Sequence, residues 1–560
     1  MKKNSILALG LGIVLLLTGC GDVVSEPNAG DSAASYLNNG ALSEEQQLLV
    51  TGNAVAVEST LPVAFGFVTQ LNINGMNADS YYRQDEIHFD SGDAYTELEG
   101  VITFRGNNYR SSASYGTAEV TKKTLSVKWS IETGSLKKTV KSGDWTGSGW
   151  TGQPLLIRWD DATKKKMNLY TEKKNKSGLV EVIYATLDGH IYFLDLDDGS
   201  KTRDAINLGY PIKGTGSLYP DGTPLYVVGA GDDQEESART FIVDLIRGQV
   251  IYEYGNDDEF ALRTDNGNFC AFDSSPLFDV ETDTLIQPGE NGILYTMKLN
   301  TSVSDTGITV DPTEIVKWNY QTDRTGSDTY WLGMESSSVI YDHYLYIADN
   351  SGDLMCIDLN TMELVWSQDI QDDSNASPVL DIDTDDGTAY IYISTSLHWT
   401  QDKKASGDIP IFKINAATGE IIWKRYYSCK TVDGVSGGVQ ATAALGENAV
   451  DNLVFFNIAR TGGKKKGKLV ALDKETGGEA WSIDLKYYSW SSPVLVYDSK
   501  GNGYLILCES GGNMHLIDAK TGTLLDTVEL GDNIEASPAV FDNTIVVGTR
   551  GKKIFAVTIE

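Results

Sequence analysis

Short apolar runs separated by turn residues recur along the chain from about residue 100 to its end. In the clearest copy, residues 469–472 form an apolar, partly β-branched run that predicts a buried strand. Asp473 and Gly477 follow and predict a tight turn, because the carboxylate can accept backbone hydrogen bonds and glycine adopts a positive φ without strain. Trp481 then falls in the next predicted strand. Each copy therefore predicts a strand, a turn and a second strand.

A tryptophan marks the second strand of this pattern. An Asp or Asn stands eight residues before it in three copies, namely Asp358 with Trp366, Asn415 with Trp423 and Asp473 with Trp481. Other copies keep the turn but carry Arg203, Tyr252 or Asp526 at the same place. Large aromatic side chains at one repeated position favour packing between neighbouring sheets. We therefore expect blade-to-blade packing by Trp129, Trp318, Trp366, Trp423 and Trp481.

The spacing of the copies, about 45–65 residues with several short strands in each, is typical of a β-propeller. Innermost strands are indicated by small-residue or Ser-Pro starts at residues 153, 216, 275, 337, 377, 442, 492 and 537. We predict an all-β fold, an eight-bladed β-propeller of four-stranded antiparallel blades. Seven blades are the alternative, because Pro220 and Pro224 delay the strand that follows Gly216.

The two ends of the chain are predicted to share one blade. The C-terminal residues supply three strands, at 539–541, 545–547 and 554–557, and then the chain ends. A four-stranded blade needs one more strand, and residues 125–129 form a strand that has no earlier strands of its own. We expect this N-terminal strand to complete the last blade and close the ring, with the propeller occupying residues 100–560.

The N-terminus resembles a bacterial lipoprotein export signal. Two lysines precede an apolar run at residues 6–17, which is too short to span a bilayer, and Leu17-Thr18-Gly19-Cys20 matches a lipobox. The resemblance implies a signal peptide at residues 1–19 and lipid on Cys20. Two or three acyl chains hold a protein stably on a membrane. The expected location is therefore an exported protein, on the surface of a single-membrane cell or facing the periplasm of a two-membrane cell.

Two further segments precede the propeller. Residues 20–47 are rich in small, polar and acidic residues and predict a flexible acidic tether. Residues 48–99 contain more apolar positions, including Val63 and Phe67. They could add a pair of strands to the propeller or form an extended arm, and the pattern does not decide between these structures.

The net charge of the chain limits the classes of partner that we expect it to bind. The formal net charge is −33, from 45 basic and 78 acidic residues. Nucleic-acid binding needs a basic surface to meet phosphate groups, so no nucleic-acid partner is expected.

The repeats also let 560 residues form one modular ring, because each sheet buries its faces against its neighbours. We expect a monomer.

The phrase strand-Asp-x-x-Thr-Gly-x-x-x-Trp, with Ser-Pro at the start of the next blade, resembles the PQQ-like repeat of eight-bladed propellers. The resemblance covers about residues 100–560 and includes Phe104-Arg105-Gly106-Asn107. Two branches share this repeat: quinoprotein dehydrogenases, which bind pyrroloquinoline quinone (PQQ) and calcium, and non-enzymatic lipoproteins similar to the outer-membrane assembly factor BamB. The fold alone does not choose between them.

Cysteine and histidine patterns argue against the dehydrogenase branch. That branch places a disulfide of two adjacent cysteines against the quinone, whereas Cys270, Cys356, Cys429 and Cys508 are far apart. The five histidines have no metal spacing, and no c-type haem motif is present. We expect no enzymatic activity and no PQQ.

Calcium is left open as a ligand. Asp381, Asp383 and Asp385 alternate in an acidic turn between two predicted strands, and alternate carboxylates can converge on a hard cation. The turn departs from the calcium-loop pattern, with Asp386 where glycine is expected. An ordinary acidic hairpin turn is the alternative.

A second group of aromatic residues lies outside the repeat. Trp150, Trp331 and Trp490 precede the innermost strands, and Trp399 beside His398 lies in an insertion at residues 396–408. These positions predict loops on one face of the ring. An aromatic-rimmed face could stack a sugar ring or bind a peptide, and local packing within the loops is the alternative. The candidate binding face consists of Trp145, Trp150, Trp331, His398, Trp399 and Trp490.

Together these patterns favour a lipid-anchored propeller that acts as a non-catalytic scaffold for a protein or peptide partner. Resemblance to the assembly-factor branch implies a role in cell-envelope protein assembly. The alternative is a surface protein that binds a polysaccharide or another solute through the aromatic face. A PQQ-dependent dehydrogenase is the third and least favoured interpretation.

Overall fold

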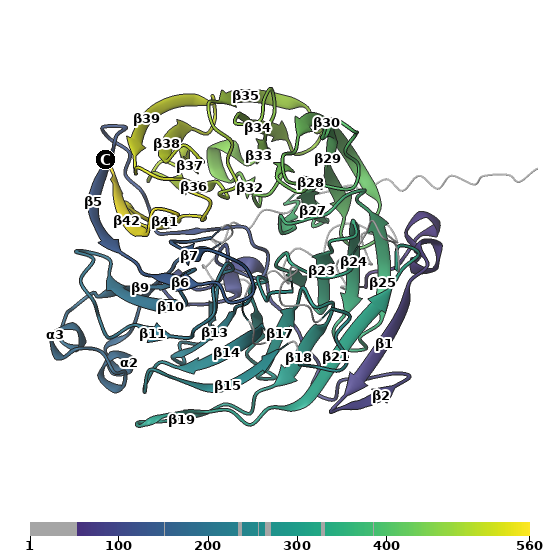
Figure 1. Cartoon of the computed structure of the whole chain (residues 1–560), viewed down its shortest axis with the longest axis horizontal. Helices are drawn as coiled ribbons and strands as arrows, with labels where there is room; N and C mark the ends of the chain where they lie inside the picture. Colours follow the sequence, from purple (N-terminus) through teal and green to yellow (C-terminus); the bar gives the residue numbers. More distant parts are fainter. Residues whose placement is uncertain are drawn as a thin grey trace, which may run out of the picture. The chain divides into compact units, whose positions relative to one another are not determined.

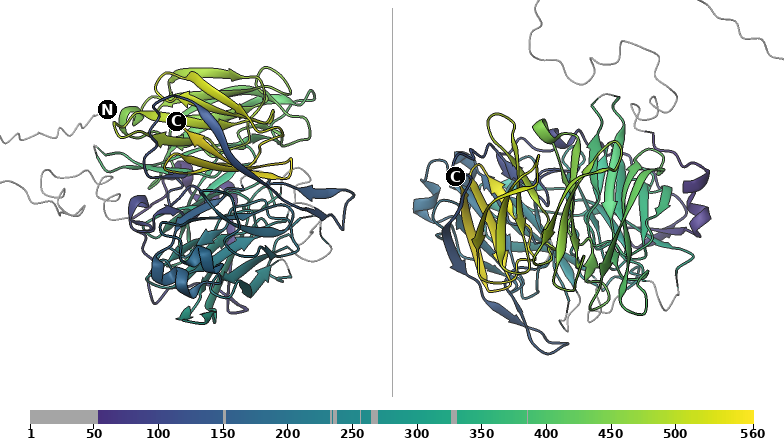
Figure 2. Two further views of the ribbon diagram at one scale, coloured as in Figure 1. Left: turned by 90° about the vertical axis from the view of Figure 1, so that its left-hand side faces the viewer. Right: turned by 90° about the horizontal axis from the view of Figure 1, so that it is seen from above.

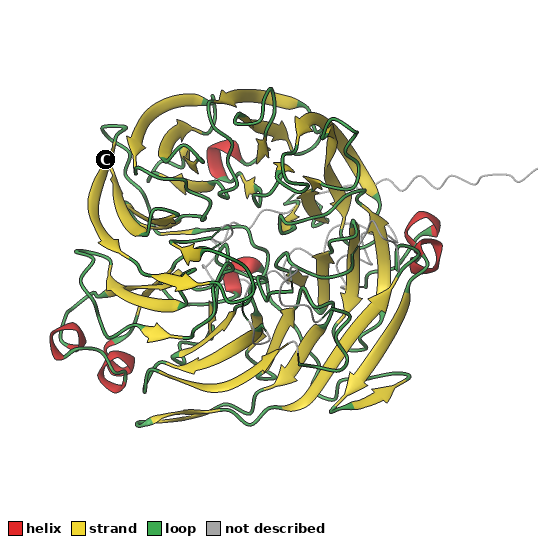
Figure 3. Cartoon of the chain, in the orientation of Figure 1, coloured by secondary structure: helices red, strands yellow, loops and turns green. Residues whose placement is uncertain are grey.

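The computed structural model describes residues 53–149, 152–232, 234, 238–255, 257–263, 270–325, 331–384 and 386–560. Residues 45–560 belong to one compact unit. Its sheets are arranged in a ring of eight blades, each running outward from the axis (Figure 1). Nearly all regular structure is β, with a few short helical turns at the edges and near the centre (Figure 3). The predicted all-β, eight-bladed propeller is confirmed, and the seven-bladed alternative is wrong.

Blades 1 to 4 follow the chain order from the innermost strand to the outermost. Blade 1 contains β8 (Leu155–Arg158), β9 (Val180–Ala185), β10 (His190–Asp195) and β11 (Ile206–Asn207). Blade 2 contains β12 (Ser217–Leu218), β13 (Leu225–Gly229), β14 (Arg239–Asp244) and β15 (Gln249–Gly255). Blade 3 contains β16 (Leu277–Asp279), β17 (Thr284–Pro288), β18 (Leu294–Lys298) and β21 (Thr313–Gln321). Blade 4 contains β22 (Val339–Tyr341), β23 (Tyr344–Ala348), β24 (Asp353–Asp358) and β25 (Leu364–Asp369).

Blades 5 to 8 continue the ring. Blade 5 contains β26 (Val379–Ile382), β27 (Ala389–Ser394), β29 (Ser406–Asn415) and β30 (Ile421–Lys430). Blade 6 contains β32 (Ala444–Leu445), β33 (Leu453–Ala459), β34 (Gly467–Asp473) and β35 (Glu479–Leu485). Blade 7 contains β36 (Val494–Tyr497), β37 (Gly503–Cys508), β38 (Asn513–Asp518) and β39 (Thr523–Glu529). Blade 8 contains β40 (Ala539–Phe541), β41 (Thr544–Thr549), β42 (Lys553–Ile559) and β5 (Leu125–Glu132).

The remaining elements lie at the margins of the blades. Strands β3 (Gly100–Val101) and β4 (Ser114–Tyr115) pair with β8 and β40, while β28 (Ser396–Leu397) and β31 (Gly437–Gly438) pair with each other beside β33. Two hairpins are formed by β6 (Ser135–Lys137) with β7 (Asp144–Thr146) and by β19 (Ser302–Ser304) with β20 (Gly307–Thr309). The helical turns are α2 (Asp161–Lys166), α3 (Thr171–Lys174), η2 (Glu58–Thr60), η3 (Pro62–Phe65), η4 (Gly92–Ala94) and η5 (Asn448–Val450).

Blade 8 closes the ring as predicted. Strand β5 pairs antiparallel with β42, and Trp129 lies opposite Ala556. Figure 2 shows β5, in blue, beside the yellow C-terminal strands. The weak sequence signal near Gly216 does start a blade, but its first strand has only two residues, because the chain then turns at Pro220 before β13 begins.

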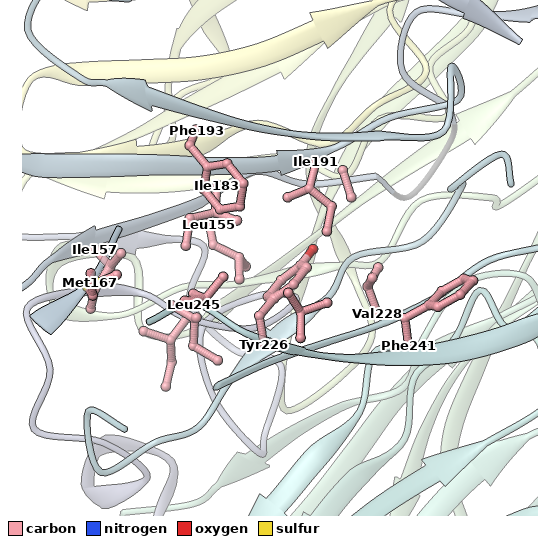
Figure 4. Close-up of a cluster of buried hydrophobic side chains, with 14 of the residues drawn as sticks. Leu155, Ile157, Met167, Ile183, Ile191, Phe193, Tyr226, Val228, Phe241 and Leu245 are labelled. Atoms are coloured by element: carbon pink, nitrogen blue, oxygen red, sulfur yellow. The ribbon is translucent and has the colours of Figure 1, made fainter. Parts of the chain in front are cut away.

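The core lies between the blades. Middle strands such as β9 and β37 are buried along their whole length, because each blade packs both faces against its neighbours. Figure 4 shows one such layer, where side chains of blade 1, including Ile183 and Phe193, meet Tyr226 and Phe241 of blade 2. Apolar side chains thereby pack each blade against its neighbours around the ring.

The repeated tryptophan links each blade to the turn of the next. The indole N–H donates to the carbonyl oxygen of the residue that follows the turn Asp or Asn, and the bonds are Trp129 to Leu196 at 2.9 Å, Trp366 to Ala416 at 3.0 Å, Trp423 to Lys474 at 3.0 Å and Trp481 to Ala519 at 3.1 Å. The ring packs on the turn glycine. A Cβ atom at Gly419, for example, would lie 2.6 Å from the Trp366 ring, so only glycine fits there.

Where the pattern lacks its tryptophan or glycine, another group makes the link. Arg203 occupies the tryptophan position of blade 1 and donates through Nη1 to the Leu245 carbonyl oxygen at 2.8 Å. Asp526 occupies it in blade 7 and accepts a 2.7 Å bond from the backbone N–H of Leu125, where the closing strand begins. At Arg203 and Asp526, two of the three substituted tryptophan positions, a charged side chain therefore keeps a blade-to-blade contact.

Blade 3 is linked to blade 4 by the N-terminal segment. Met362 replaces the turn glycine of blade 4, and the buried indole of Trp318 has no hydrogen-bond acceptor in the described part of the chain. Instead, Nε of Arg83 donates to the Leu359 carbonyl oxygen at 3.3 Å, and Nη2 of Arg83 donates to Thr296 at 2.8 Å. Arg83 thus supplies the hydrogen bond that a repeat tryptophan makes elsewhere.

Residues 53–99 combine both structures that the sequence allowed. The hairpin of β1 (Val68–Ile73) and β2 (Met76–Ala78) extends blade 3, because β1 pairs with β21 over its whole length. The residues on either side form an extended arm over the neighbouring blades. Before the hairpin, Thr60 Oγ1 donates to the Thr418 carbonyl oxygen of blade 5 at 2.7 Å.

One segment crosses the axis where the innermost strands begin. Arg110 donates to the carbonyl oxygens of Ser275 at 2.8 Å and Ser338 at 2.9 Å, in blades 3 and 4. Arg105 donates to the Pro493 carbonyl oxygen in blade 7 at 2.9 Å. Burial lowers the pKa of both arginines to about 9. Arg105 and Arg110 therefore link blades on opposite sides of the ring, a role that the sequence pattern did not predict.

Candidate functional site

A ring of hydroxyl groups fixes the backbone around the axis. At the start of five innermost strands, a backbone N–H donates to a hydroxyl group of the next blade. The bonds are Ser275 to Ser337 at 2.9 Å, Ser337 to Ser377 at 2.9 Å, Ser377 to Thr442 at 3.1 Å, Thr442 to Ser492 at 3.0 Å and Ser492 to Ser537 at 3.1 Å. This explains the Ser and Thr residues that mark the blades in the sequence. The residues next to these hydroxyl groups are consequently held at similar positions along the propeller axis.

The residue two positions before each hydroxyl faces a common level of the ring. In blade order these residues are Lys213, Asp273, Glu335, Asn375, Gln440, Trp490 and Glu535. One side of this level is therefore charged, with Lys213, Asp273 and Glu335 on consecutive blades. The local sequence pattern does not mark these residues, although their spacing from the repeated hydroxyls could have identified them.

Lys213 lies between two carboxylates. Its Nζ is 2.6 Å from Asp232 Oδ2 and 2.8 Å from Asp273 Oδ2, and all three side chains are buried. Burial acts to lower the pKa of Lys213, but these carboxylates raise it well above its usual value. Lys213 is therefore a cation that holds Asp232 and Asp273 together.

Glu335 is held by amide groups. Its Oε2 accepts from Asn375 Nδ2 at 2.8 Å and from Asn350 Nδ2 at 3.2 Å. Asn350 Nδ2 also donates to Asp373 Oδ1 at 2.9 Å, so a second carboxylate lies close by. The other oxygen of Glu335, Oε1, has no hydrogen-bond donor among the described residues.

Burial disfavours the ionised form of these acids. Desolvation raises the pKa of Glu335 to about 7, and it raises the pKa of Asp273 above its usual value. The pKa values of Glu290 and Asp373 are raised further, by burial first and by the negative charge of Glu335 second. Such shifted carboxylates gathered from several blades are typical of a functional site.

Three carboxylates of this group could hold a metal ion. Asp273, Glu290 and Glu335 each offer an oxygen atom, and these atoms lie within 4.8 Å of one another. The donor set consists of oxygen alone, which suits hard cations such as calcium. Ion binding is therefore a chemistry that this set of oxygen atoms supports.

An aromatic rim lies next to this cluster. Trp331 contacts His398 and Trp399, with ring centroids 5.0 Å and 5.1 Å apart, and His398 stacks on Trp399 at 3.5 Å. All three side chains are half-buried. Trp399 Nε1 donates to the Asn350 carbonyl oxygen at 2.8 Å, and the same Asn350 binds Glu335 through its side chain. The structure therefore brings together three of the predicted face residues, beside the buried carboxylates described above.

Asp372 fixes the shape of the rim. Its buried carboxylate accepts hydrogen bonds from the backbone N–H groups of His398, Trp399 and Thr400, at 2.8–3.1 Å. Burial lowers the pKa of His398 to about 4, so the imidazole is neutral at pH 7. We define the aromatic rim as Trp331, His398 and Trp399.

Two other predicted face residues, Trp145 and Trp490, make different contacts. Trp490 donates to the Ser436 carbonyl oxygen at 3.3 Å and contacts Tyr488. Trp145 lies on β7, where the Lys138 ammonium sits 3.8 Å from its ring centroid. Trp150 and the lipid-attachment residue Cys20 lie outside the described residues. The whole six-residue binding face stays a prediction.

The acidic turn of blade 5 lies away from the residues described above. Asp381 is part of β26 and forms a 2.9 Å ion pair with Lys474. Asp383 accepts the backbone N–H of Gly387 through its carbonyl oxygen, as in a hairpin turn. Asp385 lies outside the described residues. Calcium binding by this turn stays a prediction.

Comparisons with known proteins agree with the repeat. Residues 465–560 match the protein family described as "Outer membrane protein assembly factor BamB". Among solved structures, BamB from Moraxella catarrhalis is 15% identical, with a TM-score of 0.43, and the match covers 72% of this chain and 96% of that one. No curated protein matches the chain.

Dehydrogenases of known structure match the chain with similar sequence identities and TM-scores. Quinohemoprotein alcohol dehydrogenase from Comamonas testosteroni is 12% identical, with a TM-score of 0.42, and the match covers 84% of this chain and 82% of that one. A europium-containing methanol dehydrogenase is 13% identical, with a TM-score of 0.40, covering 83% and 100%. The chain is a β-propeller, and its residues 465–560 are similar to the BamB assembly-factor family.

Proposed function

We propose that the protein is an exported, lipid-anchored propeller that acts as a non-catalytic scaffold for a protein partner in cell-envelope protein assembly. The lipobox at Cys20 supports the anchor, and the family match at residues 465–560 supports the assembly role. The buried cysteines Cys270, Cys356, Cys429 and Cys508 form no disulfide in the described part of the chain, which supports a scaffold over a dehydrogenase of the usual kind.

The preorganised aromatic rim is the observation that carries this proposal. Half-buried aromatic side chains supply much of the binding energy at protein interfaces. Binding costs less when such groups are already ordered. Here the Asp372 carboxylate holds the backbone of the rim, and Trp399 is held by its bond to the Asn350 carbonyl oxygen. The rim therefore has the properties of a contact surface for a partner.

A photoreactive phenylalanine analogue in place of Trp399 is expected to cross-link an envelope protein in living cells. The same analogue at Tyr426 is the matched control, because Tyr426 is an exposed aromatic residue on the outermost strand of the same blade. Mass spectrometry of the adducts identifies the partner. Trp331→Ala should reduce the Trp399 adduct several-fold, since Trp331 packs against Trp399.

Equal adducts at Trp399 and Tyr426, or none at either position, would contradict a partner-binding rim. Dye-linked alcohol oxidation by the purified chain with added PQQ and calcium would overturn the non-catalytic assignment. A glycan array separates the second candidate function, polysaccharide binding. The edge-to-face pair of Trp331 and Trp399 favours that candidate, because a sugar ring stacks on such surfaces.

Cys20→Ser is expected to release the protein from the membrane fraction. Removal of the lipid-bearing sulfur leaves no acyl chains, and a single apolar run of this length does not span a bilayer. Among the described residues, no helix is long and apolar enough to cross a membrane. Metabolic labelling with a radioactive fatty acid and membrane fractionation measure the change. A labelled Cys20→Ser protein that stays with the membrane would refute the anchor.

A further inference from the structure

We propose that Asp273, Glu290 and Glu335 bind a hard divalent cation of the calcium class on the axis of the propeller, between blades 3 and 4. Asp273 precedes β16, Glu290 lies in the turn from β17 to β18, and Glu335 precedes β22. Two adjacent blades therefore supply the three carboxylates. The site is distinct from the acidic turn of blade 5 and does not depend on the scaffold function proposed above.

The separation of the oxygen atoms fits calcium. The three donor atoms lie within 4.8 Å of one another. Calcium–oxygen distances of about 2.3–2.6 Å place two oxygens on opposite sides of the ion about 4.6–5.2 Å apart. Magnesium usually keeps several water ligands and is bound by one or two carboxylates. A set of three protein carboxylates therefore suits calcium better than magnesium.

Unpartnered oxygens give a second and independent indication. Asp273 Oδ1 and Glu335 Oε1 accept no hydrogen bond within the described residues, although their side chains are only 6% and 8% exposed. The amide oxygens of Asn350 and Asn375, which border Glu335, are likewise buried without a donor. A buried polar atom without a partner costs about 1–3 kcal/mol, and more when it is charged. A bound cation would satisfy these oxygens together.

Carboxylates outnumber cationic side chains among the described residues of the site. Lys213 neutralises Asp232 and Asp273 through Oδ2 of each carboxylate, which leaves Asp273 Oδ1 available. Arg263 approaches Glu290 at 3.8 Å. Five buried carboxylates thus face two cationic side chains in the described part of the site, and these carboxylates are Asp232, Asp273, Glu290, Glu335 and Asp373. Isolated buried charges are strongly disfavoured, so the excess must be met by protons or by a metal ion.

The full-length chain, purified in detergent and treated with EGTA, is expected to bind one calcium ion by isothermal titration calorimetry. Terbium provides a second probe, because Trp331 and Trp399 lie next to the site and can sensitise its luminescence. Glu335→Gln should weaken calcium binding at least tenfold, because loss of an outer-shell partner alone costs about 10–100-fold in metal affinity and Glu335 is proposed as a direct ligand. Saturating calcium should raise the thermal midpoint of the wild-type chain by several degrees.

The acidic turn supplies the matched control. Asp381→Asn with Asp383→Asn removes two carboxylates from blade 5 and should leave the calcium affinity unchanged. Glu335→Gln should fold, because an amide costs less to bury than a carboxylate, and its thermal midpoint in EGTA should equal or exceed that of the wild type. No calcium heat and no midpoint shift in the wild-type chain would overturn the proposal. Loss of binding only in the blade 5 variant would overturn it as well.

Discussion

Trp366→Ala is expected to lower the free energy of unfolding by about 3–5 kcal/mol, the range measured when large buried aromatic residues are truncated. Trp366 is fully buried between blades 4 and 5. Its indole N–H donates to the Ala416 carbonyl oxygen, and its ring packs on Gly419 and near Tyr346. Truncation removes these contacts together and leaves a cavity that rigid neighbouring sheets cannot close. Urea unfolding followed by tryptophan fluorescence and circular dichroism measures the loss.

Tyr426→Ala provides the control for this measurement. Tyr426 is 48% exposed on the outermost strand of blade 5, and surface substitutions of this kind change stability by about 0.5 kcal/mol or less. Trp423 has the same hydrogen bond as Trp366 but is only half-buried, so Trp423→Ala should cost less than Trp366→Ala. A Trp366→Ala chain as stable as Tyr426→Ala would show that the repeat position does not hold the blades together.

Arg203→Ala should cost about 3–5 kcal/mol, because it leaves a buried carboxylate without its counter-charge. Arg203 binds Glu181 through two contacts, Nε to Oε1 at 3.1 Å and Nη2 to Oε2 at 2.6 Å, and these side chains are 1% and 0% exposed. The variant also loses the bond from Arg203 to the Leu245 carbonyl oxygen of blade 2. The thermal midpoint and the urea midpoint should therefore both fall.

A charge-neutral double variant tests the cause of that loss. Arg203→Met combined with Glu181→Gln removes both charges, and the glutamine can still accept from Trp159 Nε1, so more than half of the stability should return. Lys122→Ala is the control, because its ion pair with Glu560 is exposed and such pairs contribute about 1 kcal/mol or less. A double variant as unstable as Arg203→Ala would assign the loss to packing and not to charge.

The local pattern of the sequence was enough to predict the ring. The turn from Asp or Asn to glycine and the tryptophan that follows it make contacts within one blade and with its neighbour. About ten residues of sequence are therefore enough to predict these contacts. Closure by residues 125–129 was predictable because the C-terminal residues supplied only three strands of the last blade. The roles of Arg203 and Asp526 were not predictable, since a charged side chain at a tryptophan position gives no sign of the carbonyl or N–H group that it meets.

The cluster of buried carboxylates around Asp273 and Glu335 was not predictable, for a different reason. Asp273 and Glu335 are 62 residues apart in the chain and come together only because the ring places successive blades at one axis. Among many acidic residues, nothing marks them locally except their distance from the ring hydroxyls. The aromatic rim was partly predictable, because Trp331 and Trp399 lie in loops that must emerge on one face, but their contact through Asn350 depends on the packing of two blades.

The pairing of β5 with β42 sets the order in which the protein can mature. Leu125 lies opposite Ile559, so the contact that closes the ring joins two strands that are far apart in the chain, and β5 is synthesised long before β42. Until β42 emerges from the ribosome, the backbone hydrogen-bonding groups along one edge of β5 lack their partner strand, and exposed strand edges promote aggregation. Protection of that edge until β42 is synthesised is therefore a requirement that this topology imposes on the cell.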